Sequence, residues 1–297
     1  ILYPESIFRL NLFLRVRFKG NLIGFGSAPE GLENNEVVYE LLADMGWSSD
    51  SIDLDDWMKI YCEARYGGYP DAMEEAWKLF RKTAYSSLYS YPRFTWQTVI
   101  SDQRRISKID LSDDYLQAIR LYASCADELK SSELYRNDLI EFVSYYVAAK
   151  AENFYKQALK DDSENRVLAA QRNLQQTVDL LMDVDRLLAS HPLYRLEEWV
   201  ELARNSGTTL QEKDAYEANA KRLITSWGGI QEDYAARFWS GLIKDYYIPR
   251  IQLYFTKDRN KIREWEEQWI TSPWSNSTTP FDDPVEAALS LIEKTNK

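Results

Sequence analysis

The sequence predicts a mainly α fold: a large all-helical, bundle-like domain over residues 36–297, preceded by a short β segment over residues 1–35. Two observations lead to this prediction. Apolar residues of the first segment alternate with a period of two, which is typical of a half-buried strand. Apolar residues of the second segment recur three and four positions apart, which is the spacing of one helix face. Helical domains are built by packing such faces together.

The β segment begins with apolar residues at every second position over residues 8–18, with four polar residues and one phenylalanine between them. An apolar run at residues 22–26 predicts a second, buried strand, and a loop around Pro29 follows it. A sheet of only two strands is marginally stable by itself. We therefore interpret this segment as the last piece of a larger β-containing domain.

The helices are predicted from apolar stripes bounded by start and stop signals. Asp53 is expected to cap a helix that Gly67 ends, and Ser112 is expected to begin another. Thr209 and Glu212 form a capping box at the start of a later helix. The other expected helical stretches are residues 37–45, residues 70–84, a long helix from residue 131 or 132 onward, residues 166–189, residues 193–204 and a short final helix through residues 287–292.

Specific expectations concern the region near Trp227. The helix before it is expected to stop at Trp227, and the next helix is expected to cover residues 232–247, with Pro249 ending it. Tyr234 would then approach Trp227 from the start of that helix. Residues 272–284 are rich in Ser, Thr and Pro and are expected to form a loop.

The charge balance excludes two classes of partner. The chain has 36 basic and 47 acidic residues and a formal net charge of −11. Binding of nucleic acid needs clustered Lys and Arg, and docking on an anionic membrane surface needs the same, so neither is expected. No stretch approaches the roughly 18 apolar residues of a membrane-spanning helix.

The residues that bind metals are scarce, since the chain has two cysteines and one histidine. No HExxH or CxxC spacing occurs, so no metal site is expected. Cys62 and Cys125 are expected to be small buried side chains, with a single disulfide as the alternative, and His191 is expected to lie in a loop. The aromatic content is high, with 10 Trp, 20 Tyr and 11 Phe, which either fill a large core or also stack on sugar rings.

Glu30 is a candidate catalytic carboxylate. It follows the predicted buried strand directly and stands between Pro29 and Gly31, which restrict the backbone. Catalytic groups of (β/α)₈ barrels lie at the carboxyl ends of the strands, where such a carboxylate acts as a nucleophile or a proton shuttle. By itself the pattern leaves open an ordinary loop glutamate.

Residues 24–41, GFGSAPEGLENNEVVYEL, resemble the signature segment of the α-N-acetylglucosaminidases, glycoside hydrolase family 89. Two further blocks are similar to the family in order and spacing, over residues 57–77 and residues 219–250. The second block contains the Asp-Tyr-Ala sequence at residues 233–235 and ends in Tyr-Tyr-Ile-Pro-Arg at Arg250. The Pro-Glu-Gly segment and the second block are the most specific parts of the resemblance.

The resemblance implies a domain organisation. Members of the family have a small N-terminal domain, a (β/α)₈ barrel and a large all-helical C-terminal domain. Residues 1–35 are then expected to be the end of the TIM-barrel catalytic domain, which is incomplete in this sequence. Residues 36–297 are expected to be the all-helical C-terminal domain, with the upstream barrel of the same enzyme as its partner. The resemblance also suggests a lysosomal, secreted or periplasmic location.

The resemblance further implies hydrolysis of terminal α-linked N-acetylglucosamine from glycans with retention of configuration. Glu30 matches the nucleophile, and Trp227 and Tyr234 match aromatic residues that line the sugar pocket from the helical side. A retaining mechanism needs a second carboxyl group about 5–5.5 Å from the first. In the family that acid lies earlier in the barrel, so little or no hydrolysis is expected from these 297 residues alone. No metal or organic cofactor is expected, because two carboxyl groups suffice for this chemistry.

We therefore expect part of a retaining exo-glycosidase that acts on glycans with terminal α-linked N-acetylglucosamine. Glu30 supplies the nucleophile in this interpretation, and Trp227 and Tyr234 supply one wall of the sugar pocket. The alternative is a non-catalytic helical interaction or carbohydrate-binding domain, whose aromatic residues serve only as core or platform.

Overall fold

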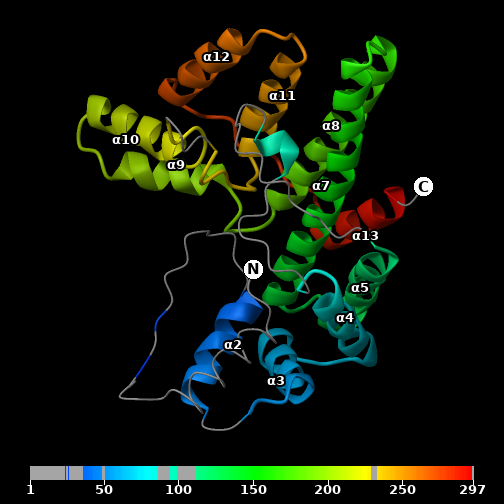
Figure 1. The fold of residues 1–297 in the computed structure, drawn as a ribbon. Helices are drawn as coiled ribbons and strands as arrows, with labels where there is room; N and C mark the ends of the chain where they lie inside the picture. Colours follow the sequence, from blue (N-terminus) through cyan, green and yellow to red (C-terminus); the bar gives the residue numbers. More distant parts are fainter. Residues whose placement is uncertain are drawn as a thin grey trace. The chain divides into compact units, whose positions relative to one another are not determined.

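The computed structural model describes residues 36–48, 51–85, 94–98, 112–228 and 233–295, together with Gly24 and Gly26. These residues are mainly helical, and their strand-like pairing is one isolated parallel bridge between Arg195 and Ser240 (Figure 1). The mainly α prediction is confirmed for this part of the chain. The predicted β segment lies outside the described residues, apart from the two glycines.

The chain divides into two compact units. Unit 1 consists of Ile1–Pro92 and Lys108–Arg136, and unit 2 consists of Arg93–Ser107 and Asn137–Lys297. The expected domain boundary near residue 35 lies at the edge of the described residues and stays a prediction.

Unit 1 is a cluster of helices around an aromatic core. The rings of Tyr61, Tyr66 and Tyr122 are buried, and consecutive rings in this series meet edge to face at 6.2 and 5.9 Å between centroids. Such pairs add to the stability that burial alone provides. The helices are α2 (Glu36–Trp47), α3 (Leu54–Tyr66), α4 (Asp71–Lys82), α5 (Asp113–Ser124), α6 (Ala126–Leu129) and the first residues of α7 (Glu133–Ser163).

The predicted boundaries of α3 are confirmed. The Asp53 carboxylate accepts hydrogen bonds from the backbone N–H of Asp55 and Asp56 at 2.9 and 3.1 Å, which satisfies two donors of the first turn. Gly67 ends the helix with a φ of +85°, a left-handed conformation that glycine adopts without steric cost. The predicted cap at Ser112 is confirmed as well, since its hydroxyl accepts from the backbone N–H of Tyr115 at 3.2 Å.

Unit 2 contains the rest of α7 and the later helices. Helices α9 and α10 pack side by side, α10 also contacts α12, and α8 contacts the segment that leads into α11 (Figure 1). The capping box of Thr209 and Glu212 is present at the start of α10. The elements are the 3₁₀ helix η1 (Thr95–Gln97), α8 (Val167–Leu188), α9 (Leu196–Asn205), α10 (Leu210–Leu223), the π-helix η3 (Ile243–Tyr247), α11 (Ile248–Tyr254), α12 (Arg259–Thr271) and α13 (Pro284–Lys294).

The predicted helix over residues 232–247 is wrong in its first part, and only the end of it is helical, as η3. Asp233 has a φ of +60°, which no α-helix contains, and the chain stays non-helical as far as Ser240, whose backbone pairs with that of Tyr194 and Leu196. Pro249 does not end a helix either. It lies in the first turn of α11, which continues directly from the π-helix η3, so the helical path runs through this proline.

The end of α10 also differs from the expectation, since the helix stops at Leu223 rather than at Trp227. The predicted loop after residue 272 is confirmed, and α13 follows it. Cys62 and Cys125 are both buried and form no disulfide, so the expectation of two small buried side chains is confirmed.

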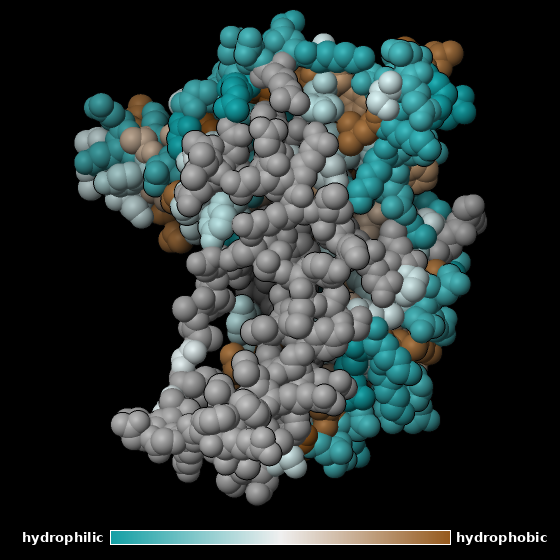
Figure 2. Space-filling model, viewed as in Figure 1, coloured by the Kyte–Doolittle hydropathy of each residue, from teal (hydrophilic) through white to brown (hydrophobic). Residues whose placement is uncertain are grey.

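Hydrophilic residues cover most of the described surface that Figure 2 shows, and apolar residues are scattered over it rather than gathered in one area. Several large apolar side chains are exposed, for example Trp47, Leu168 and Leu210. Among the described helices, none has the length and apolar character needed to cross a membrane.

Candidate functional site

The structure brings together two of the three predicted site residues. The rings of Trp227 and Tyr234 meet edge to face, with their centroids 5.7 Å apart and their planes at 67°. Trp227 is 36% exposed and Tyr234 is half-buried, so the pair is part of the surface of unit 2 rather than of its core. Glu30 lies outside the described residues.

Trp227 is held in an uncommon backbone conformation at the end of α10. Its φ is +53°, and Gly228 follows with a φ of +114°. The backbone N–H of Trp227 donates to the carbonyl of Arg222 at 2.9 Å, which closes the turn beyond the helix. A left-handed conformation is unfavourable for a bulky residue, and such strain is often found at functional positions.

Tyr234 is positioned by its neighbour Asp233. The Asp233 carboxylate is buried and accepts two hydrogen bonds from Arg250, from Nη1 at 2.9 Å and from Nη2 at 3.0 Å. This two-point pairing of planar groups fixes both direction and distance. The sequence patterns assigned no role to Asp233 and Arg250. Each is the charged residue of an otherwise apolar and aromatic motif, over residues 233–235 and 246–250, and this could have indicated a buried ion pair.

Arg250 is in turn held by three other groups. Its Nη1 donates to the Gln97 carbonyl at 2.8 Å, and its Nε lies 2.6 Å from Oε1 of Glu266. The Tyr246 hydroxyl donates to the same Glu266 oxygen at 2.8 Å, and its ring lies 5.3 Å from the guanidinium carbon. Burial raises the pKa of the Tyr246 hydroxyl well above its usual value, so that it stays a donor. The guanidinium thereby joins η1, α11 and α12 to the Asp233 turn.

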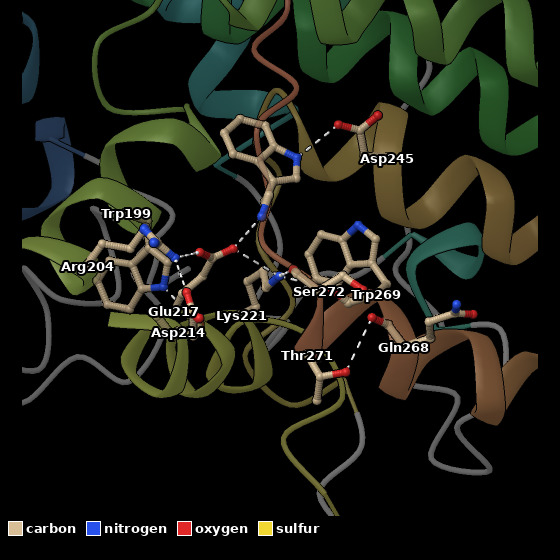
Figure 3. Close-up of polar contacts among 12 residues, drawn as sticks. Trp199, Arg204, Asp214, Glu217, Lys221, Asp245, Gln268, Trp269, Thr271 and Ser272 are labelled. Atoms are coloured by element: carbon tan, nitrogen blue, oxygen red, sulfur yellow. Dashed lines mark hydrogen bonds and ion pairs between the residues drawn. The ribbon is translucent and has the colours of Figure 1, made fainter. Parts of the chain in front are cut away.

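A second buried cluster stabilises the helix that leads into Trp227 (Figure 3). The Glu217 carboxylate on α10 lies between Arg204 on α9, at 2.6 Å, and Lys221 one turn further along α10, at 3.1 Å. The Lys221 ammonium also donates to the backbone carbonyls of Trp269, at 2.9 Å, and of Ser272. Burial lowers the pKa of Lys221. These contacts join α9, α10 and the end of α12, and they give Trp227 a rigid support.

The remaining candidates for chemistry have structural roles. His191 is buried, and its Nδ1 accepts from the backbone N–H of Leu193 at 3.1 Å, as expected of a loop histidine. Burial raises the pKa of the Cys125 thiol to about 11, which keeps it in the unreactive thiol form. Within the described ranges, no three His, Cys, Asp or Glu side chains are grouped closely enough to hold a metal ion.

Comparisons with protein families agree with this picture. The model of the alpha-N-acetylglucosaminidase (NAGLU) C-terminal domain matches residues 57–294, which is most of the chain. The model of the alpha-N-acetylglucosaminidase (NAGLU) tim-barrel domain matches residues 9–49.

Individual relatives belong to the same group. The chain is 32% identical to the human alpha-N-acetylglucosaminidase over 306 residues, which cover 92% of this chain and 40% of the human protein. A family 89 glycoside hydrolase from Clostridium perfringens, solved with 2-acetamido-1,2-dideoxynojirmycin, superimposes with a TM-score of 0.85 at 23% identity. The match covers 98% of this chain and 37% of that one. A variant of that enzyme with two Glu-to-Gln substitutions, solved with its substrate GlcNAc-alpha-1,4-galactose, gives 0.86 over the same shares.

The chain thus spans less than half the length of these relatives. The solved structures share its fold, and the family match includes the segment that carries the aromatic pair. This chain belongs to the alpha-N-acetylglucosaminidase family, with its helical part matching the C-terminal domain of that family.

Proposed function

We propose that this chain is part of a retaining exo-glycosidase that hydrolyses terminal α-linked N-acetylglucosamine from glycans. Glu30 supplies the nucleophile, and Trp227 and Tyr234 supply one wall of the sugar pocket. The observation that carries the proposal is the partly exposed ring pair of Trp227 and Tyr234, next to the buried ion pair of Asp233 and Arg250, in a chain of this family.

The relatives support the choice of substrate class. The human relative carries the name alpha-N-acetylglucosaminidase, and the Clostridium perfringens enzyme was solved with its substrate GlcNAc-alpha-1,4-galactose. Since this chain covers 40% and 37% of those proteins, we assign the activity to the whole protein and only part of the site to this chain. Residues 1–35 are assigned to the end of the barrel and residues 36–297 to the helical domain.

The proposed reaction has two steps. A carboxylate oxygen of Glu30 forms a bond to the anomeric carbon while the glycosidic C–O bond breaks, and a second carboxylic acid protonates the leaving oxygen. Water, deprotonated by that same second group, then displaces Glu30 and releases the sugar with its original configuration. The second carboxyl group is assigned to the upstream barrel. The aromatic face of Trp227 packs on the apolar face of the sugar ring, and the Tyr234 hydroxyl hydrogen-bonds to the sugar.

The test is Glu30→Gln in the full-length protein that contains this chain. Turnover of an aryl α-N-acetylglucosaminide is expected to fall by at least about 10³-fold, because a nucleophile has no substitute at its position. The matched control is Glu33→Gln, three residues further along the same segment, which is expected to keep turnover close to that of the wild type. Near wild-type turnover of Glu30→Gln would contradict the assignment. A wild-type protein that binds the glycan and never cleaves it would favour a non-catalytic carbohydrate-binding domain.

A further inference from the structure

We propose that Arg250 is a positioning residue for the sugar wall: through the buried Asp233 carboxylate it holds Tyr234, and with it the Tyr234–Trp227 ring pair, in the orientation that receives the sugar. The inference rests on the proposed function, because that function assigns the ring pair to the sugar. Arg250 itself touches no substrate in this proposal.

The backbone at Asp233 has an uncommon conformation. Its φ of +60° lies in the left-handed region, which is unfavourable for residues other than glycine and less so for Asp and Asn. Tyr234 is the next residue, so the conformation at Asp233 sets the direction in which the Tyr234 side chain leaves the chain. A contact that holds Asp233 in this conformation therefore also orients the Tyr234 ring.

The ion pair between Asp233 and Arg250 is the contact that holds this conformation. The side chains of Arg250 and Asp233 are each only 1% exposed, and both guanidinium Nη atoms donate to the carboxylate. In a buried setting the pair is screened little by water, and removing one partner leaves an uncompensated charge. The pairing also depends on the planar fork of arginine, which lysine does not offer.

Arg250 is itself fixed. Its contacts to the Gln97 carbonyl and to Glu266 come from η1 and α12, which are far from Asp233 in the sequence. The η1 segment is fixed in turn, because both oxygens of Glu152 on α7 accept from the backbone N–H of Thr95. Through Arg250, Asp233 is thus linked by hydrogen bonds and ion pairs to several helices of unit 2. These contacts also fix the position of the Tyr234 ring.

The experiment uses two conservative variants of the full-length protein. Asp233→Asn keeps the shape of the side chain and a residue that tolerates the left-handed region, and it removes the charge. Arg250→Lys keeps the charge and loses the two-point geometry. Both are expected to weaken competitive inhibition by N-acetylglucosamine and to raise the KM for an aryl α-N-acetylglucosaminide by about 10-fold, with a smaller change in kcat.

The matched control is an Arg–Asp pair elsewhere in unit 2. Arg166 donates from Nε to the Asp161 carboxylate at 3.0 Å, beside a turn in which Asn165 has a φ of +59°. Asp161→Asn and Arg166→Lys are expected to alter thermal stability and to leave both the inhibition constant and the KM within about 2-fold of the wild type. This control distinguishes a general loss of stability from a displacement of the Tyr234 ring.

The decisive arm is a double-mutant cycle with Tyr234. If Asp233 acts on the sugar through Tyr234, Asp233→Asn is expected to add nothing to the loss that Tyr234→Ala already causes. Losses that simply add would overturn the proposal, and so would inhibition by N-acetylglucosamine that neither Asp233→Asn nor Arg250→Lys changes. Should Asp233→Asn fail to fold, Asp233→Gly takes its place, because it removes the backbone strain and the carboxylate together. It too is expected to add nothing to the loss that Tyr234→Ala causes.

The same assay distinguishes this proposal from the proposed function. If the wild-type protein neither cleaves the aryl glycoside nor binds N-acetylglucosamine, the proposed function fails and the positioning role fails with it. If the wild type does both and the two variants behave like it, only the positioning role of Arg250 is wrong.

Discussion

Trp227 and Asp233 adopt left-handed backbone conformations on either side of a short stretch of chain, with φ values of +53° and +60°. Neither conformation is one that its residue prefers, and each is held by a hydrogen bond or an ion pair to another part of unit 2. Backbone strain of this kind persists only where surrounding contacts determine the structure, and it is often found where a side chain must be presented. In this chain the strained backbone sets the direction of the Trp227 and Tyr234 side chains.

Replacing Trp227 by alanine tests the ring pair at the scale of one residue. Loss of an aromatic side chain that packs on a ligand costs about 2 kcal/mol, so kcat/KM for an aryl α-N-acetylglucosaminide is expected to fall by about 30-fold. Trp47→Ala is the control, because Trp47 is 92% exposed and has no proposed role. Equal effects of the two substitutions would argue against a sugar contact at Trp227.

Asp185 on α8 is a buried carboxylate that accepts from the backbone N–H groups of Gly241 and Lys244, at 2.8 and 3.1 Å, and from the Thr278 hydroxyl at 2.6 Å. Burial raises its pKa, and these hydrogen bonds only partly oppose the rise. Asp245, whose pKa burial also raises, lies close enough to Asp185 for the two charges to repel each other.

A pH dependence of stability follows from the raised pKa of Asp185. A carboxyl group with a higher pKa in the folded state than in the unfolded state binds its proton more tightly when folded, so it favours folding more as the pH falls through the folded-state pKa. Relative to Asp185→Asn, the free energy of unfolding of the wild type is expected to increase as the pH falls from neutral towards the usual pKa of an aspartate. Asp183→Asn on the same helix is the control. Parallel pH profiles for wild type and Asp185→Asn would show that this carboxyl group does not titrate as described.

At the scale of elements, the helices of unit 2 are joined by buried charges as well as by apolar packing. Lys221 on α10 has no exposed side-chain surface, contacts Glu217 on its own helix, and donates to two carbonyls at the end of α12. Its ammonium also lies 5.0 Å from the centre of the Trp269 ring. Because every donor is directed at an acceptor or a ring face, this lysine links two helices that apolar contacts alone would leave less well defined.

Lys221→Met is expected to destabilise the protein by about 3 kcal/mol, because it removes one of the two cations that pair with the buried Glu217 carboxylate and leaves two carbonyls without their donor. Urea unfolding measures this difference. Lys213→Met, on the same helix and only half-buried, is the control and is expected to change the free energy of unfolding by less than about 1 kcal/mol. A loss for Lys221→Met no greater than that for the control would mean that the cluster does not stabilise unit 2.

At the scale of the whole molecule, the proposed chemistry needs two carboxyl groups and no metal ion. Turnover by the full-length protein is therefore expected to be unchanged in excess EDTA. Loss of turnover that a divalent metal ion restores would require a different mechanism.

Much of the helical fold could be predicted from the sequence, because caps and stops are local signals. Asp53, Gly67 and Ser112 act through bonds to residues within one turn, and the structure confirms all three. The segment after Trp227 could not be predicted in this way. Its non-helical path depends on the pair of Asp233 with Arg250, 17 residues later, and on the bridge between Ser240 and Arg195. Local propensity carries no information about such contacts.

The candidate site could be predicted only in part, because contacts between distant parts of the chain also build it. The resemblance pointed to Trp227 and Tyr234, and the two rings do meet, although Tyr234 approaches from a turn rather than from a helix. The buried network of Arg250, Glu266 and Tyr246 behind them was missed, because it joins residues of η3, α11 and α12 through side-chain contacts that no periodicity reveals.

The most direct test of the account is chemical rescue of Glu30→Ala in the full-length protein with sodium azide and a 2,4-dinitrophenyl α-N-acetylglucosaminide. The activated leaving group departs without an acid, and azide, in the space of the missing carboxylate, attacks the anomeric carbon from the opposite face. Azide is expected to restore turnover, and the expected product is the β-linked N-acetylglucosaminyl azide. An α-linked azide, or turnover that persists without azide, would contradict it.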